Sequence, residues 1–154
     1  MHLKEDEDMA ITLIPFATAK IQLKPPLTIE AGPMGTRNVF EVAKAEFNVT
    51  PKDHDSFTMS LTGVAADWML VSPQGAATLD IRATFQTDDG AIVYVNYYGK
   101  ADLSKGIVFP VTIYVAPRFE ASEPRYSWLN ALQLVGKGIV DENLLLDYEW
   151  YEMV

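Results

Sequence analysis

Hydrophobic and polar residues alternate most regularly between positions 79 and 86. Apolar Leu79, Ile81, Ala83 and Phe85 share one face of this run, and polar Asp80, Arg82, Thr84 and Gln86 share the other. A period of two is typical of a β-strand. Asp89-Gly90 follows, and both residues tolerate the positive φ that tight hairpin turns require. Residues 91–99, rich in Val, Ile and Tyr, therefore predict a second strand that pairs with the first.

Similar runs recur along the rest of the chain between clusters of Pro, Gly, Asp and Ser. They predict strands near residues 11–23, 37–48, 56–62, 67–71, 77–87, 91–99, 107–115, 131–139 and 143–152. About nine strands at this spacing favour an antiparallel barrel or sandwich. Ser122-Glu123-Pro124 is typical of a helix start, so we expect a short helical turn at 123–130. The fold class is thus mainly β.

Length, charge and composition restrict the function. The 154 residues suit one domain, which we place at 11–154 behind a flexible acidic tail at 1–10. The net charge of −9 disfavours binding to nucleic acid, because that affinity depends on Lys and Arg. No apolar run approaches the ~18 residues of a membrane helix, so no membrane partner is expected. The N-terminus shows no export signal, which predicts a cytoplasmic protein.

Several kinds of chemistry have no support in the residues. The absence of Cys excludes disulfides, Cys-ligated zinc, iron–sulfur clusters and thiol nucleophiles. His54 stands between two Asp residues without a second His at ligand spacing, so we expect no metal. No Gly-rich phosphate loop and no Gly-x-Ser-x-Gly sequence is present, so neither a nucleotide cofactor nor a serine hydrolase is indicated. We expect the protein to need no cofactor.

Acidic and basic groups within the strands are candidates for binding or catalysis. Asp67 lies in an apolar run and is either a strand-end residue that accepts local backbone N–H groups or a general acid or base with a raised pKa. Arg82 shares a face with Asp80; it forms either a structural ion pair or an anchor for a ligand in a cavity. A two-residue Asp89-Gly90 loop would place Arg82 opposite Tyr97, on the same face, and Phe85 opposite Tyr94. A longer loop would shift this register.

An aromatic segment follows the strands. Phe119, Tyr126 and Trp128, together with Glu120 and Asn130, have the side chains of a pocket for an aromatic ligand. The same residues would also serve as a plug over the end of the barrel, with Trp128 and Phe119 covering the core. Both interpretations remain open at this point.

Five segments taken in order resemble a known family. They are Gly35-Thr36-Arg37, Ala65-Ala66-Asp67-Trp68, Leu79–Gly90, Pro117-Arg118-Phe119-Glu120 and Arg125-Tyr126-Ser127-Trp128-Leu129-Asn130. Their order and spacing resemble the domain of unknown function 3237 family, from about Leu13 to the C-terminus. The resemblance implies a small calycin-like β-barrel, and some fungal relatives act as cofactor-independent cyclases on aromatic natural products. This chain has Val64-Ala65-Ala66-Asp67-Trp68 where the family usually has Gly-Gly-Ala-Asp-Trp.

Two hypotheses of function follow. In the first, the barrel lumen binds a small, largely apolar or aromatic organic molecule and performs an isomerisation, cyclisation or lyase step. We predict that the polar side of the 79–87 strand faces this cavity, with Arg82 as the main anchor. Arg82 and Tyr126 would orient the molecule, and Asp67 or Glu120 would move a proton. We expect Trp68, Tyr97, Phe119, Tyr126, Trp128 and Asn130 to bind the ligand. In the second, the barrel binds the molecule without chemistry. A further alternative is a homo-oligomer in which the C-terminal strand, Tyr148-Glu149-Trp150-Tyr151, packs on another subunit.

Overall fold

The computed structural model describes residues 9–154, most of which form strands. The strands are β1 (Leu13–Leu23), β2 (Leu27–Gly32), β3 (Gly35–Val49), β4 (Phe57–Val71), β5 (Ala76–Thr87), β6 (Ile92–Asp102), β7 (Val111–Val115), β8 (Arg118–Ala121), β9 (Leu134–Val140) and β10 (Leu145–Met153). A short 3₁₀ helix, η1 (Pro124–Ala131), lies between β8 and β9. The expected acidic tail at 1–10 falls mostly outside the described residues.

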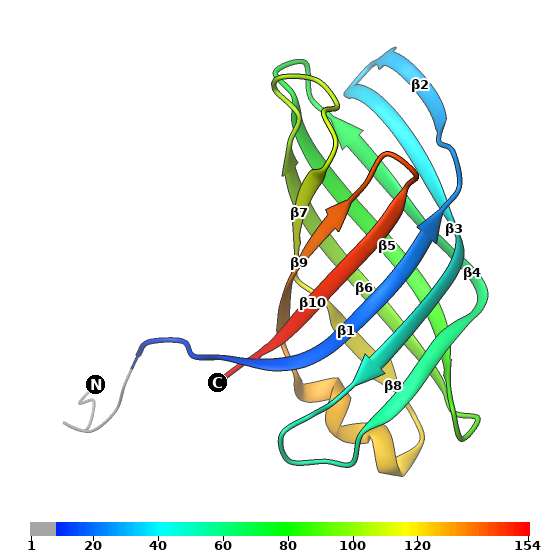
Figure 1. The fold of residues 1–154 in the computed structure, drawn as a ribbon, viewed down its shortest axis with the longest axis vertical. Helices are drawn as coiled ribbons and strands as arrows, with labels where there is room; N and C mark the ends of the chain where they lie inside the picture. The colour runs from blue at the N-terminus through cyan, green and yellow to red at the C-terminus, as the bar shows by residue number, and fades with distance from the viewer. Residues whose placement is uncertain (1–8) are drawn as a thin grey trace.

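Eight of these strands close into an antiparallel barrel. The hydrogen-bonded order is β1-β10-β9-β7-β6-β5-β4-β3, and pairing of β1 with β3 completes the ring (Figure 1). β2 extends the sheet beyond β3, and β8 pairs with β6. The predicted mainly β antiparallel barrel with one short helical turn is therefore confirmed. Closure pairs the two edge strands of the sheet with each other, so few backbone N–H and C=O groups remain free to pair with another chain.

The alternation of side chains decides which face of each strand lies inside the barrel. In β5, Leu79, Ile81, Ala83 and Phe85 are all at most 7% exposed. They pack into a core with aromatic residues of the other strands, such as Phe47 and Trp150, whose ring centroids are 4.7 Å apart. The alternate polar residues Asp80, Arg82, Thr84 and Gln86 face outward. Burial of the apolar side of each strand thus stabilises the barrel.

The hairpin between β5 and β6 has a longer loop than the sequence suggested. Gln86 pairs with Ile92, so Arg82 lies opposite Asn96 and Phe85 lies opposite Val93. The prediction of Tyr97 opposite Arg82 is wrong by one residue. Because side chains alternate, this shift moves Tyr97 to the inner face, where it is 5% exposed.

Other boundaries also differ. The strands expected at 56–62 and 67–71 form one strand, β4, with an irregularity in its pairing between Leu61 and Ala65. Gly63 lies at this irregularity with φ 72°, a conformation that glycine adopts readily. The short strands β2 and β8 were not predicted; β2 follows Pro25-Pro26 and all but its last residue are exposed. Short exposed strands lack the alternation that reveals longer ones.

The helix η1 closes one end of the barrel, the lower end in Figure 1. Its side chains Tyr126 and Leu129 are buried, and Trp128 contacts Phe16 edge-on at a ring-centroid distance of 6.3 Å. In the described residues, no helix is long and apolar enough to cross a membrane.

A candidate acid–base site in the barrel cavity

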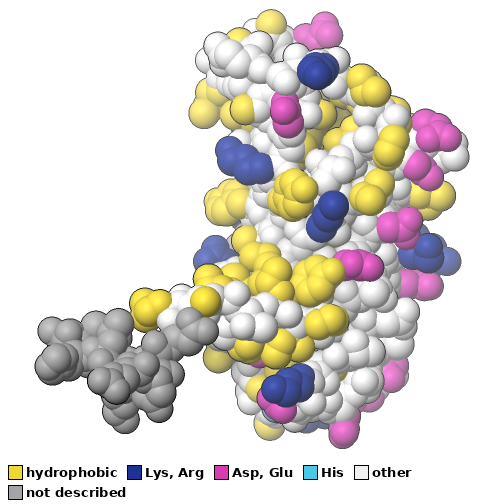
Figure 2. Space-filling model, turned by 60° about the vertical axis from the view of Figure 1, so that its left-hand side comes forward, with side chains coloured by type: hydrophobic (Ala, Val, Ile, Leu, Met, Phe, Trp, Pro, Cys, Tyr) yellow, Lys and Arg dark blue, Asp and Glu magenta, His cyan; other side chains and the backbone are white. Residues whose placement is uncertain are grey.

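A cavity of about 250 Å³ lies inside the barrel, toward the end away from η1. Side chains from the inner faces of several strands line it, and Ile107 and Phe109 from the loop between β6 and β7 also contribute. Ile107 is 57% and Phe109 is 38% exposed, so the lining continues onto the molecular surface at this end. Figure 2 shows hydrophobic side chains on the surface near the upper end of the barrel. Among the described residues that line the cavity, all are apolar except Asp67, Tyr97 and Tyr148.

Asp67 is placed in the cavity by strand register. It pairs with Ile81 of β5, and Ile81 pairs with Tyr97 of β6, so these three residues form a row on the inner face. The backbone N–H of Asp80 donates a hydrogen bond of 3.0 Å to Asp67 Oδ1. Burial in apolar surroundings raises the pKa of Asp67 to about 7, although this hydrogen bond lowers it, and the charge of Asp80 raises it further.

Two buried phenols complete the polar part of the cavity. The hydroxyl oxygens of Tyr97 and Tyr148 lie 3.2 Å apart and form a hydrogen bond. Burial is the main cause that raises the pKa of both phenols, and the charge of Asp67 also contributes. Both therefore remain protonated at neutral pH. One of their two protons serves the mutual hydrogen bond, and among the described residues the other has no hydrogen-bond acceptor.

The position of the Tyr148 ring depends on a glycine in the neighbouring strand. Gly138 of β9 pairs with Tyr148 of β10, and a Cβ added to Gly138 would lie 2.7 Å from a carbon of the Tyr148 ring. The missing side chain lets the ring pack close to the β9 backbone. One alternative in the sequence analysis had the C-terminal strand 148–151 pack on another subunit; within that strand, Tyr148 and Trp150 are buried inside the barrel. Alternation of Leu146, Tyr148 and Trp150 along 144–153 was the signal that could have placed Tyr148 inside.

The polar face of β5 does not reach the cavity. The side chain of Arg82 is 59% exposed on the outer face, and its Nε lies 3.9 Å from Asp80 Oδ1. The prediction that this face looks into the lumen is therefore wrong, because the apolar alternate residues fill the lumen instead. Trp68 is 40% exposed and does not line the cavity. Glu120 is also exposed; it lies beside Arg82 in a shallow groove on the outer surface.

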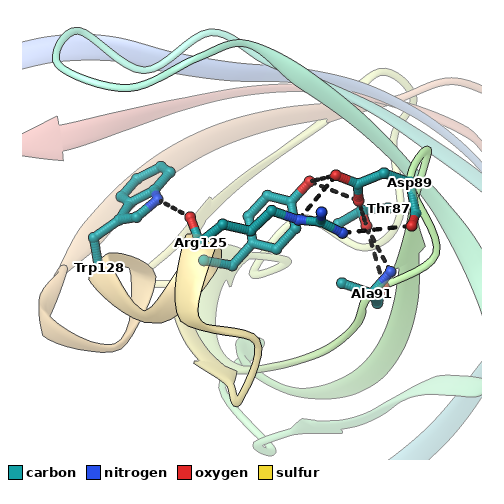
Figure 3. Close-up of polar contacts among 6 residues, drawn as sticks. Thr87, Asp89, Ala91, Arg125 and Trp128 are labelled. Carbon is teal, nitrogen blue, oxygen red and sulfur yellow. Dashed lines mark hydrogen bonds and ion pairs between the residues drawn. The ribbon is translucent and has the colours of Figure 1, made fainter.

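The remaining predicted residues gather at the closed end of the barrel, as the plug interpretation described. The Tyr126 hydroxyl lies 2.8 Å from both carboxylate oxygens of Asp89 and shares its one proton between them. Asp89 also forms a 2.9 Å ion pair with Arg125, and Thr87 donates to it at 2.6 Å (Figure 3). Trp128 Nε1 donates to the carbonyl of Arg125 at 2.9 Å. These contacts attach η1 to the β5–β6 turn.

Two further contacts hold this end. Asn130 accepts a hydrogen bond from the backbone N–H of Ala121 at 2.7 Å and donates one to its carbonyl at 2.8 Å. The His54 ring stacks on Trp128 with a ring-centroid distance of 3.9 Å. Phe119 is 7% exposed and packs in the core. None of these residues lines the cavity. Among the described residues, no group of three or more His, Cys, Asp or Glu is arranged to hold a metal.

Comparison with protein families gives a match over almost the whole chain. The model of the family described as "Protein of unknown function (DUF3237)" matches residues 11–153. A UPF0311 protein of Rhodopseudomonas palustris is 35% identical over 82 residues, which cover 46% of this chain and 54% of that protein. The chain thus spans about half the length of the curated relatives it matches.

Solved structures with the same fold extend over nearly the full length. A β-barrel-like protein of Acinetobacter baumannii has a TM-score of 0.79 at 24% identity and covers 97% of this chain and all of its own. A conserved protein of unknown function from Rhodopseudomonas palustris has a TM-score of 0.79 at 20% identity, with 96% and 100% coverage. An enzyme from Penicillium herquei has a TM-score of 0.64 at 17% identity, with 97% and 99% coverage. These likenesses show a shared fold.

Proposed function

The chain belongs to the DUF3237 family of proteins of unknown function, and from the lining of its cavity we propose that this cavity binds a small, neutral, largely apolar organic molecule. We further propose that Asp67 moves a proton on that molecule in a cofactor-free isomerisation, cyclisation or lyase step. The observation that carries the proposal is one carboxyl group, with a pKa raised to about 7, beside two phenols in an otherwise apolar cavity. The structural neighbour from Penicillium herquei, described as an enzyme, is consistent with chemistry in this fold.

The lining of the cavity supports a neutral ligand. Among the described residues, no Lys, Arg or His lines it, so a carboxylate or phosphate would lose its hydration without gaining a cation. The volume of about 250 Å³ is just below the ~300–1,000 Å³ of typical ligand pockets. A molecule of one or two rings with a single oxygen function suits this space.

The proposed chemistry follows from which groups in the cavity can accept or donate a proton. A carboxyl group with a pKa of about 7 is both a competent base and a competent acid near neutral pH. As a carboxylate, Asp67 would take a proton from a carbon next to a carbonyl group. The free hydroxyl of the Tyr97–Tyr148 pair would donate to the carbonyl oxygen and stabilise the enolate. Protonated Asp67 then returns the proton to another carbon, which gives an isomer and restores the carboxylate.

Binding is tested with two probes of the same ring skeleton, 2-naphthol and 2-naphthoate. Titration calorimetry at pH 7 is expected to detect 2-naphthol, and to find 2-naphthoate at least about tenfold weaker, because its charge has no partner in the cavity. Ile113→Trp, which places an indole in the cavity lining, should abolish binding of 2-naphthol. Equal affinity for both probes, or binding that survives Ile113→Trp, would contradict the proposed ligand class.

Proton transfer is tested with 2-tetralone, a neutral two-ring ketone with exchangeable protons next to its carbonyl group. In deuterated buffer, proton NMR is expected to show faster loss of these signals with the wild-type protein than with buffer alone. Asp67→Asn should return the rate to the buffer level. Asp147→Asn, which removes an exposed carboxylate paired with Lys20, is the matched control and should keep the wild-type rate. Binding of 2-tetralone without accelerated exchange would favour the non-catalytic carrier.

A further inference from the structure

A charged pair lies on the outer face of the barrel wall, directly behind Asp67. The backbone N–H of Asp80 donates a hydrogen bond of 3.0 Å to the Asp67 carboxylate. The backbone of Asp80 is therefore in direct contact with that carboxylate. Asp80 Oδ1 is buried and has no hydrogen-bond donor. Its nearest cation is the Arg82 guanidinium, with Nε at 3.9 Å. The Asp80 side chain as a whole is 31% exposed, but this oxygen is shielded from water, so negative charge on it is screened less than charge on a fully exposed carboxylate.

We propose that Asp80 and Arg82 control the protonation of Asp67 through the barrel wall. Asp80 favours the protonated form of Asp67 by charge repulsion, and Arg82 offsets part of that repulsion. This inference rests on the proposed role of Asp67 as the proton-transferring group. It gives Arg82 an indirect, positioning role on the solvent side of the strand, in place of the direct ligand contact that the sequence suggested.

The other groups around Asp67 do not duplicate this effect. On β3, the ladder partner of Asp67 is the uncharged Phe40. Glu41 follows it, pairs with Ala66 and forms its own ion pair of 3.1 Å with Lys24. Arg37 on the same strand donates to the backbone carbonyl of Trp68. Tyr97 from β6 and Tyr148 from β10 stay uncharged, because burial raises the pKa of each phenol. The repulsion that raises the pKa of Asp67 comes from Asp80. Asp80 and its Arg82 partner are thus the charges to alter.

The experiment follows the carbon-13 signal of the Asp67 carboxyl group from pH 4 to 9 in protein without ligand, with Asp67→Asn for assignment. Asp80→Asn should lower the titration midpoint by about 0.5–1 pH unit, since it removes the negative charge. Arg82→Gln should raise the midpoint by about 0.3–0.5 pH unit, since Asp80 then acts without its partner. Opposite directions are the diagnostic result, because general loosening of the fold would move both midpoints the same way.

Arg118→Gln is the matched control. Arg118 lies in the same row of the outer face, where its guanidinium binds Asn96 Oδ1 at 3.0 and 3.1 Å, and Asn96 pairs with Arg82. Its replacement removes one positive charge and should move the midpoint by less than about 0.2 pH unit. If Asp80→Asn fails to fold, the comparison of Arg82→Gln with Arg118→Gln decides alone.

Two outcomes would overturn the inference. In the first, the Asp67 titration midpoints of Asp80→Asn and Arg82→Gln both stay within about 0.2 pH unit of wild type, the range expected of screened surface charges. In the second, Arg82→Gln and Arg118→Gln shift the midpoint equally. The proposed function has a separate readout. Absence of 2-tetralone exchange together with the expected midpoint shifts would refute proton transfer alone. Normal exchange with unmoved midpoints would refute only the control by Asp80 and Arg82.

Discussion

Replacement of Asp67 by Asn should change how the stability of the barrel depends on pH. The pKa of Asp67 is raised from 3.8 to about 7 because the group is buried among apolar side chains. The folded protein therefore holds this proton more tightly than the unfolded chain does. As pH rises from 4 to 7, the unfolded state loses the proton first, and wild-type stability falls. The asparagine variant keeps the hydrogen-bond acceptor for Asp80 N–H but has no proton to lose.

The size of the effect follows from the shift. A difference of about three pKa units corresponds to about 4 kcal/mol, at ~1.4 kcal/mol per unit. The stability of wild type relative to Asp67→Asn should thus decrease by about 4 kcal/mol between pH 4 and pH 8. This is a large part of the ~5–15 kcal/mol that holds a typical domain together. Carboxylates elsewhere titrate equally in both proteins and cancel in the difference.

Urea unfolding monitored by tryptophan fluorescence, repeated at one-unit intervals from pH 4 to 8, measures this difference. Asp147→Asn serves as the control: its carboxylate is 68% exposed, so its curve should run parallel to that of wild type. A constant stability difference between wild type and Asp67→Asn over the whole range would refute the reasoning. It would mean that Asp67 ionises with an ordinary pKa, and that the cavity does not hold a proton near neutral pH.

Three further predictions concern the barrel itself. Asp89→Asn should lower stability at pH 7 and flatten its decline toward acid, because Thr87, Tyr126 and Arg125 hold the pKa of Asp89 below its usual value; urea unfolding from pH 3 to 7 checks this. Gly138→Ala should lower the free energy of unfolding by about 1–3 kcal/mol, because the added methyl group forces the Tyr148 ring to move. Denaturant unfolding measures this loss, and calorimetry should also show weaker binding of 2-naphthol. Leu129→Ala, fully buried in the plug, should cost about 2–5 kcal/mol, whereas a change below about 0.5 kcal/mol would show that the plug is not packed on the core.

Alternation along the strands was enough to predict the class of fold. A strand with every second residue apolar must cover that side, and about nine such strands do so in an antiparallel barrel or sandwich. The family resemblance favoured the barrel. The helical turn near 123–130 was predictable because an early Pro, here Pro124, marks such starts. The expected cap by Ser122 is wrong, since Glu123 is the N-cap and makes no side-chain capping hydrogen bond. The short strand β2 escaped prediction, since its residues are exposed and carry no pattern of burial.

The candidate site was predictable only in part. Asp67 stood out because a carboxylate within an apolar run needs an explanation, and Tyr97 was named through a hairpin pairing that proved to be one residue off. Arg82 was assigned to the cavity, although its own alternation with Ile81 and Ala83 places it on the water side. Glu120 and Asn130 are close in sequence to Phe119 and Tyr126, but neither lies in the cavity. Glu120 of β8 lines a groove on the outer surface, and Asn130 of η1 binds the backbone of Ala121 at the closed end.

The sequence by itself determined which side of each strand is apolar, and hence a mainly β fold, because that alternation is a local pattern; the barrel was implied by the family resemblance, and ring closure through β1 and β3 is a property of the tertiary structure. It also determined that any acid–base group inside would stand in apolar surroundings. Only the tertiary structure decided which inward residues meet. Tyr97 and Tyr148 are separated by 51 positions, and ring closure and strand register, which depend on contacts across the whole sheet, bring them together at the Asp67 end of the cavity.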